Sequence, residues 1–247
     1  MRVTIVGSGD AFCSGGRAHT CIEVAVKNHT ILVDFGSSSI LAFKAQGRSF
    51  NSIDAILISH LHGDHFGGLP YMLLDCQFSS GRTRPLPIFG PPGLKDRLLK
   101  SFKLSYPGLI ETGWNFDWPI IEIEPGVQQK IAGFDLMTHL VTHPSGAPAT
   151  GMRLSFNGKV FAFSGDTEWT DALYQLADHA DLFVVECCSG QEKIPGHIDW
   201  PTLKTKLPQL NAKKLAATHF SPSALLKMEE MAKAGVVPAY DGLSFEL

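Results

Sequence analysis

Short apolar runs dominate the first sixty residues and predict strands rather than helices. Runs rich in β-branched residues and bounded by turn residues occupy 3–6, 21–26 and 30–36. The continuous apolar run at 55–59 is typical of a strand that is covered on both faces. Helical spacing of apolar residues then appears at 68–78 and again at 93–102. The first half therefore predicts a run of strands followed by strand–helix units.

The second half of the chain repeats this order. Asn157-Gly158 is a strong signal for a hairpin turn between two strands. The expected elements are strands at 134–143, 151–156 and 159–166, a helix at 170–180, a strand at 181–186, a helix at 199–207, a strand at 214–220 and a helix at 221–235.

Capping residues mark the last two of these helices. Asp199 is a suitable N-cap for the helix at 199–207, and Ser221 is followed by Pro222 at the first helical position of the helix at 221–235. Gly235 fits the position just past its end. Because both halves follow strands with strand–helix units, we expect two similar layers packed face to face with helices outside. We expect one domain over residues 1–247.

Composition narrows the class of protein. The 247 residues are 44% hydrophobic and 18% charged, which is ordinary for a globular protein with a substantial core. The net charge of -3 is scattered, so no broad basic surface for nucleic acid is indicated. Five cysteines without a CxxC pair indicate reduced thiols. No stretch resembles a signal peptide or a membrane span, and we expect a cytoplasmic location without membrane partners.

The sequence SHLHGDHFGG, starting at Ser59, contains a cluster of candidate metal ligands. His60 and His62 are two apart at a strand end, so both imidazoles point to one side, and a turn at Gly63 can bring Asp64 and His65 beside them. One zinc ion takes three or four nitrogen, oxygen or sulfur ligands. A single loop rarely supplies four ligands to one metal ion, so these four candidates indicate a pair of metals.

Three further candidate ligands each follow a predicted strand: His143, Asp166 and His219. Loops at one edge of an α/β sheet are where such folds build sites. Imidazole ligands favour zinc, with manganese or iron as alternatives.

The sequence HLHGDH at 60–65 matches the HxHxDH signature of the metallo-β-lactamase superfamily, and the three later ligands stand in the order that it requires. The chain resembles this superfamily over nearly its whole length, which implies an α/β fold, a four-layer αββα sandwich. The resemblance also implies two ligand sets and a bridge: His60, His62 and His143 for one metal, Asp64, His65 and His219 for the other, and Asp166 between them.

Within the superfamily, the segments at 7–21, 65–70, 84–93 and 218–222 are similar to the ribonuclease Z-like branch. By this resemblance, His197 would assist protonation of the leaving group and Glu186 would orient it. Only 23 positions separate His143 from Asp166, so the long tRNA-gripping arm of that branch is absent, which argues against tRNA as the substrate.

The resemblance implies a zinc-dependent hydrolase, first of all a phosphodiesterase related to endoribonucleases, and a homodimer. Its substrate would be a small or cyclic phosphodiester or an RNA 3′ end. A metal-bound hydroxide near Asp64 would be the nucleophile, since bound water has a pKa of about 7. Asp64, His197 and Glu186 are thus the expected catalytic residues. The alternatives are hydrolysis of carboxylic esters, thioesters, lactones or sulfate esters, and a metal-binding sensor without catalysis.

Two other features allow more than one interpretation. Arg82 and Arg84 lie in a loop rich in glycine and serine, where solvated side chains are the default and a phosphate contact is the sharper hypothesis. The aromatic residues of GWNFDW at 113–118 favour a core or dimer contact over a base-stacking platform.

Overall fold

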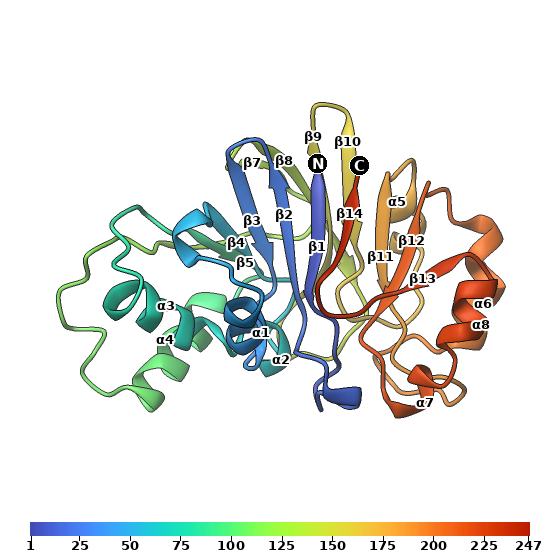
Figure 1. The fold of residues 1–247 in the computed structure, drawn as a ribbon, viewed down its shortest axis with the longest axis horizontal. Helices are drawn as coiled ribbons and strands as arrows, with labels where there is room; N and C mark the ends of the chain where they lie inside the picture. The colour runs from blue at the N-terminus through green and yellow to red at the C-terminus, as the bar shows by residue number, and fades with distance from the viewer.

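Two seven-stranded sheets pack face to face in the computed structural model, which describes residues 1–247, and helices cover their outer faces (Figure 1). The strand order is β14-β1-β2-β3-β4-β5-β6 in the first sheet and β13-β12-β11-β10-β9-β8-β7 in the second. The first sheet comprises β1 (Arg2–Gly7), β2 (Cys21–Val26), β3 (His29–Val33), β4 (Ala55–Leu57), β5 (Ile88–Gly90), β6 (Ile120–Glu122) and β14 (Leu243–Glu246). The second comprises β7 (Gln128–Ile131), β8 (Phe134–Val141), β9 (Ala149–Phe156), β10 (Lys159–Phe163), β11 (Leu182–Glu186), β12 (Leu215–Thr218) and β13 (Val236–Pro238).

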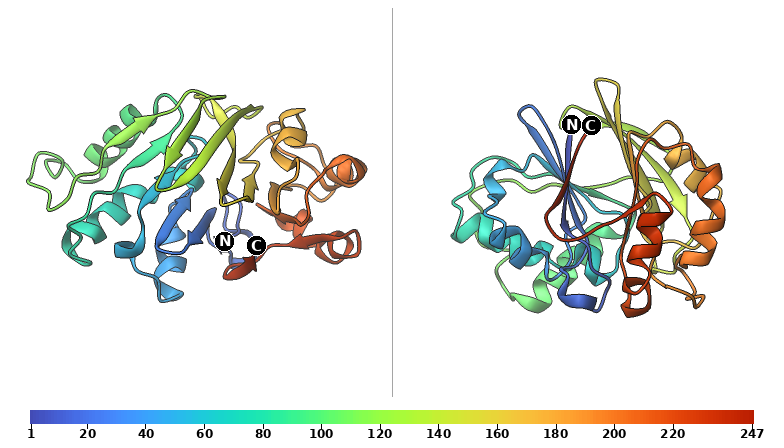
Figure 2. Two further views of the ribbon diagram at one scale, coloured as in Figure 1. Left: turned by 90° about the horizontal axis from the view of Figure 1, so that it is seen from above. Right: turned by 45° about the vertical axis from the view of Figure 1, so that its right-hand side comes forward.

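The helices fall into two groups, one outside each sheet, as the turned views show (Figure 2). The first group is α1 (Ser39–Ala45), α2 (Gly63–Phe66), α3 (Leu69–Phe78) and α4 (Leu94–Ser105). The second is α5 (Ala172–Ala177), α6 (Trp200–Lys206), α7 (Pro222–Leu225) and α8 (Met228–Lys233). Single 3-10 turns lie at Ser14–Gly16, Phe50–Ser52 and Leu207–Gln209. None of the helices is both long and apolar enough to cross a membrane.

Three separate apolar clusters confirm the predicted four-layer αββα order. The central cluster joins the inner faces of both sheets, for example Val3 of β1 and Phe161 of β10. A second cluster joins the first sheet to α1, α3 and α4, and a third joins the second sheet to α5, α6 and α8. Each sheet is therefore buried on both faces, which explains the continuous apolar runs in its central strands.

Most predicted elements are present, with ends shifted by a few residues. The Asn157-Gly158 turn joins β9 to β10, and both residues have the positive φ that a tight hairpin turn requires. Asp199 caps α6 by accepting from the Thr202 amide, and Ser221 caps α7 in the same way. The sequence analysis did not predict β5, β6, β7, β13, β14, α1 and α2, which are short.

The single helix expected at 221–235 is wrong. The chain forms two short helices, α7 and α8, which are separated at Leu226 and Lys227. No glycine or proline marks this break, so helical spacing alone could not reveal it. Gly235 does end α8 with a positive φ of 86°, as its position predicted.

Arg82 is a structural cation, and both expectations for it, solvation and phosphate contact, are wrong. Its side chain is 2% exposed. The guanidinium donates to the carbonyl oxygens of Phe50, Ile53, Arg84 and Pro85 at 2.7–2.8 Å. These bonds fasten the loop before β5 to the loop before β4. Arg84, by contrast, is exposed and pairs with Asp54 at 2.9 Å.

Replacing Arg82 with methionine should lower stability without changing the chemistry. The substitution keeps the aliphatic length but leaves buried carbonyl groups unpartnered, which costs about 3 kcal/mol in the free energy of unfolding. Chemical denaturation measures this loss. Arg84→Met is the matched control and should stay within about 0.5 kcal/mol of the parent, since its ion pair is exposed. Equal losses in the two variants would contradict the structural role of Arg82.

Candidate metal centre

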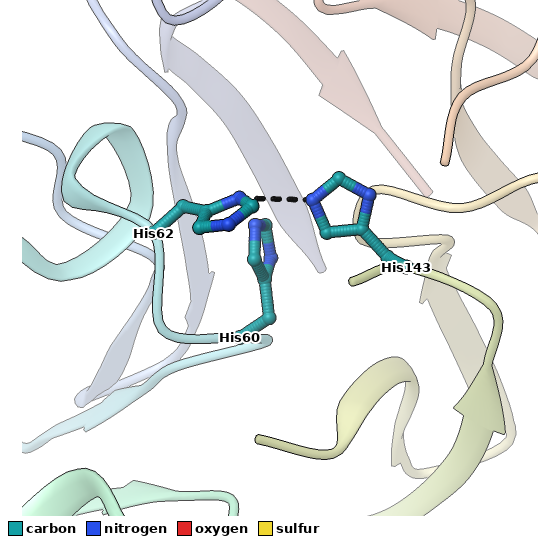
Figure 3. A group of neighbouring side chains, drawn as sticks. All are labelled: His60, His62 and His143. Carbon is teal, nitrogen blue, oxygen red and sulfur yellow. Dashed lines mark hydrogen bonds between the residues drawn. The ribbon is translucent and has the colours of Figure 1, made fainter. Parts of the chain in front are cut away.

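The first donor group consists of His60, His62 and His143, which lie together at the end of the sandwich where β4 and β8 finish (Figure 3). One ring nitrogen from each lies within 4.8 Å of the others. The rings of His62 and His143 approach each other, with His62 Nδ1 and His143 Nε2 at 2.9 Å. Three imidazole nitrogens facing one small space form the donor set typical of a zinc ion.

The second donor group consists of Asp64, His65, Asp166 and His219, again within 4.8 Å of one another. Asp166 Oδ2 lies 3.2 Å from the Nε2 atoms of both His65 and His219, and 3.8 Å from His60 Nε2 in the first group. Asp64 Oδ2 lies 3.3 Å from His65 Nε2 and 3.2 Å from His219 Nε2. Asp166 is thus the side chain that touches both donor groups.

Several of these buried atoms have no partner within the protein. His60 Nε2, His65 Nε2 and Asp166 Oδ1 are inaccessible to solvent and make no hydrogen bond. Unpaired buried polar atoms are costly and therefore rare. A pair of cations between the two groups would satisfy all three, so the residues present fit a dinuclear zinc centre.

The charges of the site are arranged for cation binding. Burial raises the pKa of Asp64 and Asp166, but the adjacent His65 and His219 lower both pKa values well below the usual range. The same contacts act on the imidazoles: burial lowers the pKa of His65, yet Asp166 and Asp64 raise it well above its usual value. Each carboxylate and each adjacent imidazole thus favours the charged form of the other, and bound metal ions would supply the same positive charge beside the carboxylates.

A buried carboxylate that the sequence analysis missed holds two of the ligands. Asp34 Oδ2 accepts from His65 Nδ1 and from the Ser59 hydroxyl, both at 2.7 Å. Ser59 Oγ lies 3.1 Å from His60 Nδ1 and accepts its proton. These bonds fix both imidazoles so that Nε2 faces the metals. Asp34 sits just past β3 with a φ of 58°, and an acidic residue inside the apolar run 30–36 was the one signal for it.

His197 and Glu186 lie at the rim of the centre. His197 Nδ1 donates to Glu186 Oε1 at 2.9 Å, and a nitrogen of His197 lies within 4.8 Å of donor atoms of His143 and Asp166. Glu186 is completely buried at the end of β11, and it also accepts from the amides of Thr167, Cys188 and Ile198. Burial lowers the pKa of His197, but Glu186 raises it above its usual value.

The structure therefore brings together all nine of the site residues expected from the sequence. They come from the segment after β4, including α2, from the loops after β8, β10 and β12, and from the end of β11 and the turn beyond it. His139, which shares strand parity with His143, lies within β8 opposite Gly151 and outside both donor groups.

Comparison with known families and structures agrees with this geometry. The model of the family described as anti-Pycsar protein Apyc1 matches residues 1–240. The human short-form tRNase Z structure superposes with a TM-score of 0.81 at 24% identity, covering 100% of this chain and 99% of that one. The metallo-β-lactamase fold protein YhfI from Bacillus subtilis gives 0.81 at 19%, with the same coverage. These two likenesses confirm the predicted fold.

The matching curated relatives are named ribonuclease Z or zinc phosphodiesterase, which agrees with the resemblance that the motifs indicated. Ribonuclease Z of Picrophilus torridus is 40% identical over 111 residues, which are 43% of this chain and 36% of the relative. Zinc phosphodiesterase ELAC protein 1 of Mus musculus is 27% identical over 222 residues, 87% of this chain and 56% of the relative. In the first four ribonuclease Z matches, the aligned part spans only 34–49% of the relative's length.

Asp34→Ala should weaken metal binding although Asp34 belongs to neither donor group. Removing the carboxylate frees His65 and, through Ser59, His60 to rotate, and loss of such a supporting partner typically costs about 10–100-fold in metal affinity. Competition with a chromophoric zinc chelator measures this. Asp54→Ala, at a distant loop, is the control. Unchanged affinity in Asp34→Ala would show that the bonds of Asp34 do not position the ligands.

Asp166→Ala should lose metal and activity together, because Asp166 is the side chain shared by both donor groups. Zinc per protein chain, measured by elemental analysis after dialysis, should fall below that of the parent. A variant that keeps two tightly bound metals would refute the bridging role.

Proposed function

Because the chain belongs to the family of the anti-Pycsar protein Apyc1, and because its ribonuclease Z-like relatives include a zinc phosphodiesterase, we propose that it is a zinc-dependent phosphodiesterase. The observation that carries the proposal is the arrangement of two donor groups around Asp166, with the paired His197 and Glu186 beside them. Two adjacent cations suit the hydrolysis of phosphate esters, since each can hold one of the oxygens that enter or leave.

The metal ions, when bound, would neutralise the phosphate oxygens and lower the pKa of water toward neutrality. The residues of the chain do the rest. Asp64, on the second donor group, is proposed to accept a hydrogen bond from the attacking water and to align it. His197 donates a proton to the oxygen of the departing alcohol. Glu186 holds the Nδ1 proton of His197 at 2.9 Å, which leaves Nε2 as the nitrogen that donates to the leaving group.

The short segment between His143 and Asp166 favours a small substrate. Residues between His143 and Asp166 form β9 and β10, which are joined by the tight turn at Asn157-Gly158. This hairpin pairs with β8 on one side and with β11 on the other, and the loops that remain in the segment are too short for an arm that grips tRNA. A small or cyclic phosphodiester is therefore the proposed substrate, and an RNA 3′ end is the second candidate.

His197→Ala should lower turnover of a phosphodiester by about 10²–10⁴-fold, because general acid assistance contributes that much. Zinc content should stay at the parent level, since His197 belongs to neither of the two donor groups. The substrate panel is bis(p-nitrophenyl) phosphate, a cyclic nucleotide, an RNA oligonucleotide, an acyl thioester, a lactone and an aryl sulfate. Steady-state rates and elemental analysis give the two readouts.

The matched control is His179→Asn, which replaces an exposed histidine in the left-handed conformation that asparagine tolerates. Its turnover should equal that of the parent. The proposal fails if the parent hydrolyses the thioester, lactone or sulfate but no phosphodiester, or if it hydrolyses nothing while holding two metals. Parent-like turnover in His197→Ala would remove His197 from the mechanism.

A further inference from the structure

His219 differs from His60, His65 and His143 in the partner of its second ring nitrogen. The Nδ1 atoms of His60, His65 and His143 each have an oxygen partner: Ser59 Oγ at 3.1 Å, Asp34 Oδ2 at 2.7 Å and the Gly196 carbonyl at 2.7 Å. His219 is 3% exposed, and its Nε2 faces Asp64 and Asp166, but its buried Nδ1 makes no hydrogen bond in the structure. A histidine that binds metal through Nε2 carries its proton on Nδ1, and that proton needs an acceptor.

The polar side chain beside His219 is that of Cys188. Its sulfur and one ring nitrogen each of His197 and His219 lie within 4.8 Å of one another. Cys188 is 7% exposed, so water does not separate it freely from the imidazole. The two residues are neighbours because β11 and β12 run parallel, with Glu186 opposite Thr218, and each strand continues for two residues or fewer to reach them.

The backbone of Cys188 is held from both sides. Its amide donates to Glu186 Oε2 at 3.1 Å, and its carbonyl accepts from the Ser221 amide at 3.0 Å. The first bond ties it to the carboxylate that orients His197, and the second ties it to the cap that follows His219. These two bonds fix the backbone of Cys188, so its side chain stays next to the imidazole of His219.

We propose that Cys188 is a positioning residue for His219: its sulfur is the acceptor available to the Nδ1 proton when Nε2 binds metal, and it takes the place of the oxygen partner that supports His60, His65 and His143. This inference rests on the metal centre of the proposed function, but not on the reaction. Sulfur is a weak acceptor, so its contribution is orientation within a buried pocket more than bond strength. Cys188 is not a ligand in this account, because His219 presents Nε2 to the metal and Nδ1 to the sulfur.

The test compares Cys188→Ala, which removes the acceptor, with Cys188→Ser, which restores one. Cys187→Ala is the matched control, since Cys187 is a fully buried neighbour whose sulfur donates to the Ser189 carbonyl at 3.9 Å and lies in neither donor group. Competition with a chromophoric chelator gives the affinity for each of two zinc ions. We expect about 10–100-fold weaker binding of one zinc in Cys188→Ala, recovery in Cys188→Ser, and parent affinity in Cys187→Ala.

Cobalt substitution separates a supporting thiol from a metal ligand. The cobalt-loaded parent should lack a thiolate-to-cobalt charge-transfer band, and its presence in the parent with loss in Cys188→Ser would make Cys188 a ligand and overturn the proposal. Equal zinc affinity in Cys188→Ala and the parent would also overturn it, as would failure of Cys188→Ser to recover binding. The parent spectrum needs no variant, so a Cys188→Ala chain that does not fold leaves the test intact.

Metal affinity is measured without substrate, which keeps this inference separate from the phosphodiesterase proposal. A parent that binds two zinc ions with the expected dependence on residue 188, yet hydrolyses no phosphodiester, would support the role of Cys188 and contradict the proposed function. If Cys188→Ala keeps both phosphodiester hydrolysis and zinc affinity at the parent level, the proposed function is supported and the role of Cys188 is contradicted.

Discussion

The attraction between two buried carboxylates and the positive charge that surrounds them is the interaction on which the site depends. Asp64 and Asp166 are 8% and 2% exposed, and their oxygens lie 3.2–3.3 Å from imidazole nitrogens. Burying such charges is costly unless a cation or hydrogen bonds offset the loss of water. Adjacent imidazoles of His65 and His219 lie where they can offset part of this cost. Metals would do so better, because they would also satisfy the buried atoms that have no partner.

The topology explains why residues so far apart in the chain meet. Each half of the molecule sends its central strands toward the same end of the sandwich, so the loops after β4 and β8, and after β10 and β12, open onto one rim. The inner apolar cluster holds the two sheets against each other. It thereby fixes the positions of the strand ends that carry the ligands. Hydrogen bonds that His65, His197 and His143 donate to Asp34, Glu186 and the Gly196 carbonyl then set the angle of each imidazole. Packing thus places the ligands, and local polar contacts orient them.

The features that could be predicted from the sequence were those set by residue spacing within short segments. The spacing of His60, His62, Asp64 and His65 indicated a metal loop, and strand-end positions identified the other ligands. Contacts set by tertiary structure were out of reach: the burial of Arg82, the support from Asp34, the break between α7 and α8, and the thiol behind His219. The roles of the nine site residues, the single domain over 1–247, the homodimer and the cytoplasmic location stay predictions.

Anomalous diffraction at the zinc edge, from crystals of the zinc-loaded protein, tests the central claim most directly. The account predicts two peaks, one within about 2 Å of nitrogens of His60, His62 and His143, the other equally near Asp64, His65 and His219, with Asp166 contacting both. A single peak, or peaks away from Asp166, would contradict it.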